Sequence, residues 1–527
     1  MKRILALILF VVLLSTSMFT LASCKKPDGG NTAGDEINYD IDLAQKPTLQ
    51  VLMPNSGKSI DAVNTSSNAT LIESLTGYKV TYTQLPTDAA TTLSTIFMDK
   101  TPYHAMKLTK DQFSDLVDQD MLVDITDALQ KFAPDLLANI SPESWEVVTV
   151  DGRIYGIPER ASSDNIENPI ILNYDLLLTL NLDVPETLTE FTEVLKKMTE
   201  YLGKPALTFD RYTPLVYAIS SAFGIYSTWQ EYDINGEKQV LFYMNAPRYN
   251  EYVEYMHSLY AAGYIDQEVP TLTASDATTR FVNGFTSMQG AKAGAYAGSL
   301  WSVPAIVTGL QSNGVISANE ASDTLDNHLC YVRSLKMNAS DPEKVYRSSG
   351  YTYITAIPYY MAENAGYALD WMNSKIKDTE TEDNFRQIVL GEEGVHWNYS
   401  PSEGYFPIDP KFQEKDDASY YMTGSNENKY TQYWLARVRK QAELYRAWST
   451  LMNKADAVGV YNIVDFTPPI EDYNKNRASV ELYAQDCFYQ MLKGGTAEFD
   501  SLVNTLNTTK GCQKATDAIN AWYKSGK

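Results

Sequence analysis

The sequence predicts an α/β protein built from two or more lobes. Its 527 residues exceed the roughly 250–300 residues at which a single hydrophobic core stops growing. Apolar residues make up 44% and charged residues 21%, a balance typical of globular rather than disordered chains. Short β-rich runs alternate with stretches of helical spacing, the pattern of βαβ units and a largely parallel sheet.

The predicted elements of the first third include four strands with intervening helices. A turn cluster at 54–57 follows the first strand, and Pro158 is expected to end a later one. The predicted strands are 48–53, 78–83, 105–108 and 152–157, and the predicted helices run from the turn to Leu75, over 89–98 and over 111–118.

The remaining elements begin with a strand at 170–173 and a well-marked helix. Thr187 with Glu190 three residues later forms a capping box, and apolar residues from Leu188 onward fall on one helical face. Residues 284–301 are rich in small side chains and predict a loop, a strand and a second loop. A strand is expected at 351–357. From about residue 420 the spacing is mostly helical, with breaks at 468–469 and 494–495.

The net charge excludes some classes of partner. The chain carries 43 Lys and Arg against 66 Asp and Glu, a net charge of −23. Neutralising phosphates requires clustered basic residues, so no nucleic-acid partner is expected. The same acidity does not favour attraction to anionic lipid headgroups.

The first 23 residues have the three parts of a secretory signal. A basic start at 1–3 precedes an uninterrupted apolar run at 4–14, and small residues lead to the sequence LASC at 21–24. The run is shorter than the ~20 apolar residues of a transmembrane helix. The LASC ending resembles a bacterial lipobox, which implies removal of 1–23 and a lipid anchor on Cys24. The alternative is an ordinary signal that contains a cysteine.

Residues 24–46 form a polar segment with few apolar side chains. Such a segment buries too little surface to order itself. We interpret it as a flexible tether between the lipid anchor and the folded body. The anchor would hold the protein at a membrane surface.

Three further cysteines remain, at Cys330, Cys487 and Cys512. Because their number is odd, at least one is free or paired outside the chain. Cys487 and Cys512 either close a C-terminal loop or are buried free thiols.

Several segments, in order, resemble one family. Together with the lipobox they resemble the extracellular solute-binding lipoproteins of bacterial ABC importers, in the group that handles carbohydrates. The resemblance covers nearly the whole chain after the signal. The segments are DGRIYGIP at 151–158, NYD at 173–175, LDVPETLTEF at 182–191, GEEGVHW at 391–397, and LKGG at 492–495 with the helices that follow to Tyr523.

The resemblance implies a two-lobed periplasmic-binding-protein-like fold, similar to maltose-binding protein, with a hinge of crossing segments and a helical C-terminal region. Lobe 1 would comprise 47–158 and 351–400, and lobe 2 would comprise 159–350 and 401–527. The ligand would be a carbohydrate, and an oligosaccharide in particular, held in the cleft between the lobes. The protein would act as a monomer and deliver this ligand to ABC permease subunits.

No cofactor or metal is expected. Some longer members of the family carry a calcium loop near residues 204–210. Here the stretch 203–210 reads GKPALTFD and lacks the run of carboxylates that calcium requires.

The candidate site residues follow from the chemistry of sugars, which present hydroxyls and apolar faces and so need flat aromatic platforms beside polar groups. Trp301 follows a small-residue strand, and the resemblance places it in the cleft. Asn55 and Ser56 follow the first strand, where open α/β sheets bind ligands. Glu159 and Arg160 follow the first crossing between lobes, although a hinge salt bridge is the alternative. The complete set is Trp301, Asn55, Ser56, Glu159, Arg160, Asp210, Tyr212 and Trp397, the last of which alternatively packs its own segment.

Enzyme motifs are lacking in the sequence. The four histidines have no HExxH spacing, and neither GxSxG nor GxxxxGK occurs. Glu392 and Glu393 are adjacent and so point in different directions, whereas a glycosidase needs two carboxyl groups facing one bond. We therefore expect binding without catalysis. The alternatives are the same fold binding a peptide or other solute, and a surface-tethered carbohydrate-active enzyme.

Overall fold

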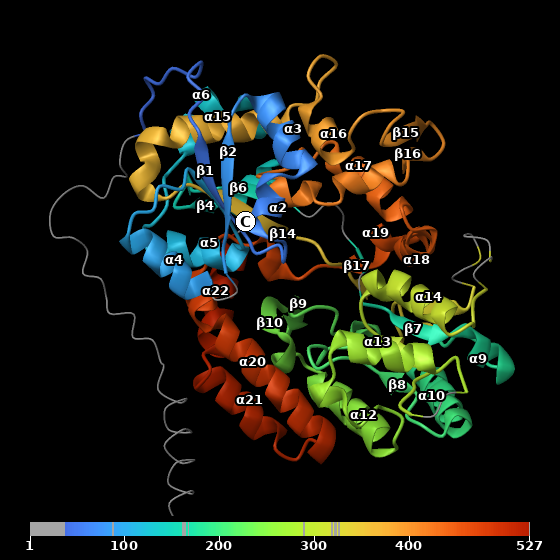
Figure 1. Ribbon diagram of the computed structural model, residues 1–527. Helices are drawn as coiled ribbons and strands as arrows, with labels where there is room; N and C mark the ends of the chain where they lie inside the picture. Colours follow the sequence, from blue (N-terminus) through green and yellow to red (C-terminus); the bar gives the residue numbers. More distant parts are fainter. Residues whose placement is uncertain are drawn as a thin grey trace, which may run out of the picture.

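The computed structural model describes residues 37–86, 89–160, 165–166, 168–287, 290–317, 320, 324 and 327–525. The predicted signal segment, Cys24 and the tether up to residue 36 lie outside this part of the chain. Figure 1 shows two lobes, the upper one holding the N-terminal strands and the lower one the green middle of the chain. None of the described helices combines the length and the apolar composition that a membrane span requires.

Lobe 1 is built on a five-stranded sheet with the order β2-β1-β3-β14-β6. β1 is parallel to β2 and β3, whereas β14 is antiparallel to β3 and β6. The prediction of a largely parallel sheet was therefore wrong, because the strands that cross between lobes enter this sheet in opposite directions. The strands are β1 (Leu49–Met53), β2 (Val80–Gln84), β3 (Ala105–Leu108), β6 (Ile157–Arg160) and β14 (Tyr351–Ala356).

Pro158 does not end a strand, contrary to the prediction. It lies inside β6 and pairs with Ile354 of β14. β6 is the last strand of the sheet. An edge strand tolerates proline because one side of its backbone needs no ladder partner. The strand therefore continues to Arg160 and carries Glu159 and Arg160 in regular extended backbone.

Helices cover both faces of this sheet and account for most of the helical predictions in the first third. α5 begins with a capping box formed by Thr109 and Gln112. The lobe 1 helices are α2 (Ile60–Asn64), α3 (Ser67–Thr76), α4 (Ala89–Met98), α5 (Lys110–Val117), α6 (Thr126–Phe132), α7 (Pro134–Asn139), α8 (Pro142–Glu146), α15 (Ala365–Ile376) and α16 (Asn384–Val389), with the short strand pairs β4 (Thr149–Val150) with β5 (Arg153–Ile154) and β15 (Trp397–Ser400) with β16 (Gly404–Pro407).

Lobe 2 has a mixed four-stranded sheet with the order β12-β7-β11-β8 between two apolar layers. The alternation of strand side chains divides them: Ile170 and Leu172 face one layer, and Ile171 faces the other. The strands are β7 (Ile170–Asn173), β8 (Leu207–Thr208), β11 (Ala295–Ala297) and β12 (Leu329–Val332). A separate antiparallel hairpin is formed by β9 (Trp229–Ile234) and β10 (Glu237–Phe242).

The lobe 2 helices confirm the predicted capping box. The Thr187 hydroxyl accepts the Glu190 N–H, and the Glu190 carboxylate accepts the Thr187 N–H. The helices are α9 (Tyr174–Thr179), α10 (Leu188–Leu202), α11 (Tyr217–Ser220), α12 (Tyr249–Ala261), α13 (Ala274–Asn283) and α14 (Val303–Ser312).

The C-terminal region is mostly helical, as predicted. The helix α20 starts after the proline pair at 468–469 and ends at Gly494, so both predicted breaks are confirmed. Cys487 and Cys512 are buried free thiols and do not pair, and Cys330 is a half-buried free thiol. The elements are α17 (Tyr430–Arg439), α18 (Ala442–Met452), α19 (Ala455–Val458), β17 (Gly459–Val460), α20 (Glu471–Gly494), α21 (Phe499–Thr508) and α22 (Cys512–Lys524).

The division of the hydrophobic core differs from the predicted lobe boundary at residue 400. Phe412, Tyr421, Tyr430 and Ala436 belong to the lobe 1 core, whereas Val438 packs in lobe 2. The boundary therefore lies inside α17. Helical spacing alone does not reveal which lobe a helix packs against, because both lobes offer an apolar surface.

Three segments cross between the lobes. One leads from β6 to β7, one from β13 (Val345–Tyr346) to β14, and one from α17 to α18. The first two are tied together by paired backbone hydrogen bonds, with the Asn165 N–H donating to Ser348 O (3.0 Å) and the Ser348 N–H donating to Asn165 O (2.8 Å). This pairing fixes the ends of β6 and β14 at the junction of the two lobes.

His104 links β3 to β1 and makes lobe 1 sensitive to acid. Its Nδ1 accepts the Gln50 N–H at 3.1 Å. Burial lowers the pKa of His104 below its ordinary value of 6.5. A group with a lowered pKa stabilises the fold above the unfolded pKa, and that contribution is lost as the pH falls through the folded pKa.

We therefore expect the free energy of unfolding to fall more steeply below pH 6.5 in the wild-type protein than in His104→Gln. Urea unfolding of both proteins between pH 5 and 8 measures the difference. Parallel pH profiles would contradict this role of His104.

Candidate ligand-binding site

A cavity of about 670 Å³ lies where the two lobes meet. Its volume is within the range of roughly 300–1,000 Å³ that ligand pockets occupy. Lobe 1 supplies most of the lining, and Trp301 reaches it from lobe 2. The lining residues are Asn55, Ser56, Lys58, Val63, Glu159, Arg160, Asn165, Trp301, Ser348, Thr352, Tyr353, Asp416, Asp417, Ser419, Tyr420, Tyr421, Tyr430, Trp434 and Arg437.

Five of the eight predicted site residues line this cavity: Asn55, Ser56, Glu159, Arg160 and Trp301. They come from three elements that are distant in sequence. Asn55 and Ser56 follow the carboxyl end of β1. Glu159 and Arg160 end β6, and Trp301 lies in a 3₁₀ turn after β11. The carboxyl ends of strands are the expected place for ligands in open α/β sheets.

Trp301 presents a largely free aromatic face to the cavity. It lies in the 3₁₀ turn Leu300–Ser302, which the Ser299 hydroxyl caps by accepting the Trp301 N–H at 3.2 Å. The side chain is 40% exposed. Its ring meets that of Trp434 edge-to-face, with centroids 5.6 Å apart. Trp301 is carried by lobe 2 and Trp434 by the crossing helix α17, which packs against the cores of both lobes, and the two indoles form an aromatic wall of the cavity.

Buried lysines hold the segment 415–422 that forms another wall. The Lys107 ammonium donates to the carbonyls of Ser419 and Met422, each at 2.8 Å, and the Lys375 ammonium donates to Tyr421 O at 3.0 Å. These contacts direct the Tyr420 and Tyr421 backbone toward the body of lobe 1. The aromatic lining is therefore positioned by charged groups beneath it.

Lys107 also forms an ion pair with Glu159 at 2.8 Å, and both side chains are buried. Burial lowers the pKa of Lys107 and raises the pKa of Glu159, while their mutual attraction opposes both shifts. The Lys107 ammonium lies 4.8 Å from the centre of the Tyr353 ring, which also lines the cavity. The pair thus joins β3, β6 and β14 directly below the cavity.

Polar side chains around the rim are held by local hydrogen bonds. The Ser56 N–H and hydroxyl both donate to the side-chain oxygen Oε1 of Gln84, at 2.7 and 2.8 Å. The Tyr420 hydroxyl donates to Pro54 O at 3.0 Å. Asn55 Oδ1 accepts the Gly57 N–H at 2.8 Å, and the Asn55 NH₂ makes no hydrogen bond within the described residues.

Sequence reasoning missed the lining residues between 416 and 437. These include Asp416, Asp417, Tyr420, Trp434 and Arg437. The boundary at 400 assigned them to the wrong lobe. The one sequence signal that could have indicated them is the high frequency of aromatic residues from Tyr420 to Trp434, which is unusual for a solvent-exposed helix.

Three predicted site residues do not line the cavity. The Asp210 carboxylate caps a turn of lobe 2 by accepting the Tyr212 N–H at 2.7 Å, and Tyr212 is 66% exposed on the surface. Trp397 is only 4% exposed, and its Nε1 donates to Gly391 O at 2.9 Å. Trp397 therefore packs its own segment, which is the alternative considered from the sequence.

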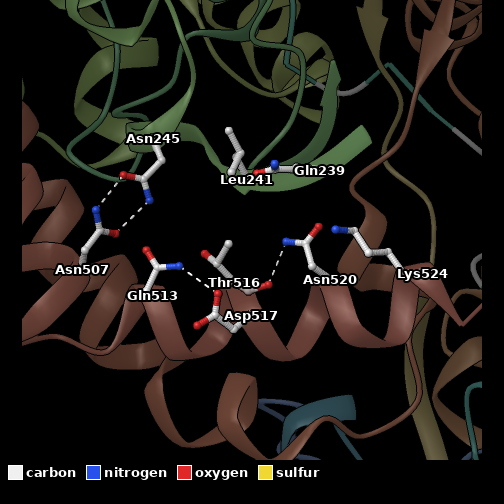
Figure 2. A pocket seen from close by; sticks show the side chains of 9 residues that line it. All are labelled: Gln239, Leu241, Asn245, Asn507, Gln513, Thr516, Asp517, Asn520 and Lys524. Carbon is white, nitrogen blue, oxygen red and sulfur yellow. Dashed lines mark hydrogen bonds between the residues drawn. The ribbon is translucent and has the colours of Figure 1, made fainter. Parts of the chain in front are cut away.

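A second cavity of about 340 Å³ lies within lobe 2, between β10 and α22 (Figure 2). Its polar side chains largely bond to each other or to backbone. Asn245 and Asn507 exchange hydrogen bonds of 2.9 and 3.0 Å, and Asn520 bonds both the N–H and the C=O of Val240 at 2.8 Å. Figure 2 shows no aromatic ring among the labelled side chains. The cavity between the lobes is therefore the better candidate site.

The described residues contain no group of three or more His, Cys, Asp or Glu side chains arranged to hold a metal ion. The three carboxylates that line the main cavity each lie beside an ammonium group instead. The chemistry available in the cavity is hydrogen bonding, aromatic contact and charge pairing.

Comparison with known proteins gives a sequence match and a fold match. A family model described as bacterial extracellular solute-binding protein matches residues 69–315. An uncharacterized protein of the butB 5′ region in Niallia circulans is 27% identical over 280 residues, which are 53% of this chain and all of that protein.

Solved structures of similar fold cover most of the chain. An HMO-binding, ABC-transporter-associated solute-binding protein from Bifidobacterium longum infantis has a TM-score of 0.63 and 16% identity, over 91% of this chain and 99% of that one. The ABC-transporter substrate-binding protein FusA from S. pneumoniae, an EF-hand mutant in complex with fructo-nystose, has a TM-score of 0.60 and 17% identity, over 91% and 100%.

The N-glycan transport solute-binding protein NgtS from Streptococcus pneumoniae, in complex with Man1GlcNAc, has a TM-score of 0.50 and 16% identity, over 91% of this chain and 99% of that one. At these identities the structures share the fold with this chain. The sequence match to the extracellular solute-binding family therefore extends over residues 69–315, and the solved structures share the two-lobed fold of the chain.

Proposed function

We propose that the protein captures a carbohydrate, and an oligosaccharide in particular, in the cavity between its lobes and delivers it to the permease subunits of an ABC importer. The observation that carries the proposal is the wall formed by Trp301 and Trp434 beside the polar groups of Asn55 and Ser56. Flat apolar faces next to fixed hydrogen-bonding groups match the two kinds of surface that a sugar presents.

Proteins of similar fold support a carbohydrate ligand. Their descriptions name HMO, fructo-nystose and Man1GlcNAc as bound sugars, each an oligosaccharide. The volume of the cavity, about 670 Å³, is that of a pocket for a small-molecule ligand such as an oligosaccharide. No observation in the cavity favours a peptide over a sugar.

In the proposed mechanism the ligand draws the lobes together. Trp301 would contact the sugar from lobe 2, Tyr353 and Arg160 would contact it from lobe 1, and Trp434 would contact it from the crossing helix α17. A ligand shifts a hinge equilibrium only by its differential affinity for the two states, so contacts from both lobes favour closure. The closed form would then dock on the permease, which would use ATP.

The proposed location is the outer face of the cell membrane. A diacylglycerol on Cys24 and the tether up to residue 46 would hold a monomeric body near the permease. The support for this part of the proposal is the signal and the LASC sequence at 21–24.

The test is ligand binding by the purified body, residues 37–527, across panels of neutral oligosaccharides, acidic oligosaccharides and peptides. We expect a sugar to raise the melting temperature, because a ligand at 100 times its Kd stabilises the native state by about 2.7 kcal/mol. Calorimetry would then give the Kd. Stabilisation by peptides alone would overturn the proposal, and chromatography that finds the bound sugar cleaved would favour an enzyme instead.

A further inference from the structure

The carboxylates that line the cavity are all neutralised by neighbouring ammonium groups. Each lies within 3.2 Å of a lysine nitrogen, so none offers a free negative charge to a ligand. The pairs are Glu159 with Lys107 at 2.8 Å, Asp416 with Lys440 at 2.7 Å, and Asp417 with Lys58 at 3.2 Å. Asp417 also accepts a hydrogen bond from the Asn68 amide at 2.6 Å.

Two guanidinium groups that line the same cavity, those of Arg160 and Arg437, have no carboxylate partner among the described residues. The Arg160 guanidinium makes no hydrogen bond or ion pair within the described part of the chain, although Arg160 is half-buried. Arg437 donates to the backbone carbonyl of Lys415 and to no carboxylate among the described residues. When the paired lysines are counted together with their carboxylates, the charged groups at the cavity have a surplus of two positive charges.

This surplus stands out against the rest of the molecule. The chain has a net charge of −23, so an average surface would repel an anion. A half-buried guanidinium loses hydration, which is costly unless a partner replaces the water. A planar carboxylate is the partner that the guanidinium fork matches best, through two parallel charge-assisted hydrogen bonds.

We propose that the ligand carries a carboxylate group, as in a uronic acid or sialic acid, and that Arg160 binds it with Arg437 supplying further positive charge. This inference rests on the proposed function and narrows its substrate class to acidic oligosaccharides. Arg160 ends β6 beside the crossing between lobes, so the carboxylate would lie at the base of the cavity. The aromatic wall would hold the sugar rings above it.

The experiment compares acidic oligosaccharides with their own methyl esters. Oligogalacturonates, oligoglucuronates and sialyllactose are titrated calorimetrically into the wild-type body, each beside the ester that keeps the ring and removes the charge. We expect the acid with the highest affinity to bind at least 10-fold more tightly than its ester, and its affinity to fall with added salt.

Substitutions of single arginines test which residue binds the carboxylate of the ligand. Arg160→Gln is expected to raise the Kd of the acid about 10- to 100-fold and that of the ester less than 3-fold, and Arg437→Gln is expected to act in the same direction. The matched control is Arg153→Gln, which removes the same charge from a partly exposed lobe 1 arginine paired with Asp124 and Asp127. This control should leave both Kd values unchanged.

The outcomes separate the two proposals. If neutral sugars bind and acids bind no better than their esters, the inference is overturned and the carbohydrate function stands. If an acid binds but Arg160→Gln leaves its Kd unchanged, the assignment to Arg160 is overturned. If no sugar in either set binds, the proposed function fails, and the inference fails with it.

Discussion

Replacing Lys107 with methionine is expected to lower the free energy of unfolding by about 3–5 kcal/mol, the cost of removing one member of a buried ion pair. The Lys107 side chain is fully buried and lies 2.8 Å from Glu159. Its ammonium also donates to the carbonyls of Ser419 and Met422. The substitution therefore leaves a buried carboxylate and the carbonyls of Ser419, Tyr420 and Met422 without their donor, and loosens the wall of the cavity.

The loss in Lys107→Met should grow as the pH rises. Burial raises the pKa of Glu159, and loss of the ammonium raises it further. A carboxyl whose folded pKa lies above the unfolded value stabilises the fold below that unfolded pKa, and the contribution is lost as the pH rises through the folded pKa. Urea unfolding at pH 5 and pH 8 should therefore show the larger loss at pH 8.

Two variants serve as comparisons for Lys107→Met. Lys238→Met breaks a surface pair with Glu231, at 3.0 Å, and should change the free energy of unfolding little, because solvent screens such pairs. The double variant Lys107→Met/Glu159→Gln removes the stranded charge and should recover part of the stability. If Lys107→Met costs no more than Lys238→Met, the buried pair does not support the cavity wall as described.

Replacing Trp301 with alanine is expected to raise the Kd of the bound oligosaccharide about 10- to 100-fold, the effect of losing a central aromatic anchor. Trp301 is the lobe 2 side chain that faces the cavity across from lobe 1. Its 40% exposure and single edge-to-face contact with Trp434 mean that the fold loses little. Calorimetry measures the Kd, and the melting temperature without ligand should stay within a few degrees of the wild-type value.

Tyr212→Ala is the matched control for Trp301→Ala. Tyr212 is also a lobe 2 aromatic residue and is 66% exposed, but it lies outside the cavity. This variant should bind as the wild type does. Trp301→Phe should recover part of the affinity, because it restores a smaller flat face. Equal Kd values for Trp301→Ala and wild type would remove Trp301 from the site.

The sequence predicted those parts of the fold that local chemistry determines. The capping box of Thr187 and Glu190 starts α10, and the turn after β1 places Asn55 and Ser56 at a strand end. Both depend on residues a few positions apart. Arg160 was also found, because its place after a crossing strand follows from chain order.

The remaining parts depend on long-range packing, which spacing does not encode. Residues 416–437 join lobe 1 because Lys107 and Lys375, more than 45 residues away in sequence, bind the carbonyls of this segment. Pro158 remains in a strand because β6 lies at the sheet edge, a fact about topology. Trp397 looked like a ligand contact from its residue type, yet it donates to a carbonyl six residues away.

The contact between Trp301 and Trp434 gives the molecule an intrinsic optical reporter. Two indoles held at 88° and 5.6 Å form a chiral pair, one carried by lobe 2 and the other by the helix α17 that crosses between the lobes. Any hinge rotation that separates them would change the near-ultraviolet circular dichroism and the emission of both rings. The opening and closing of the unlabelled protein can therefore be followed in real time by stopped-flow mixing.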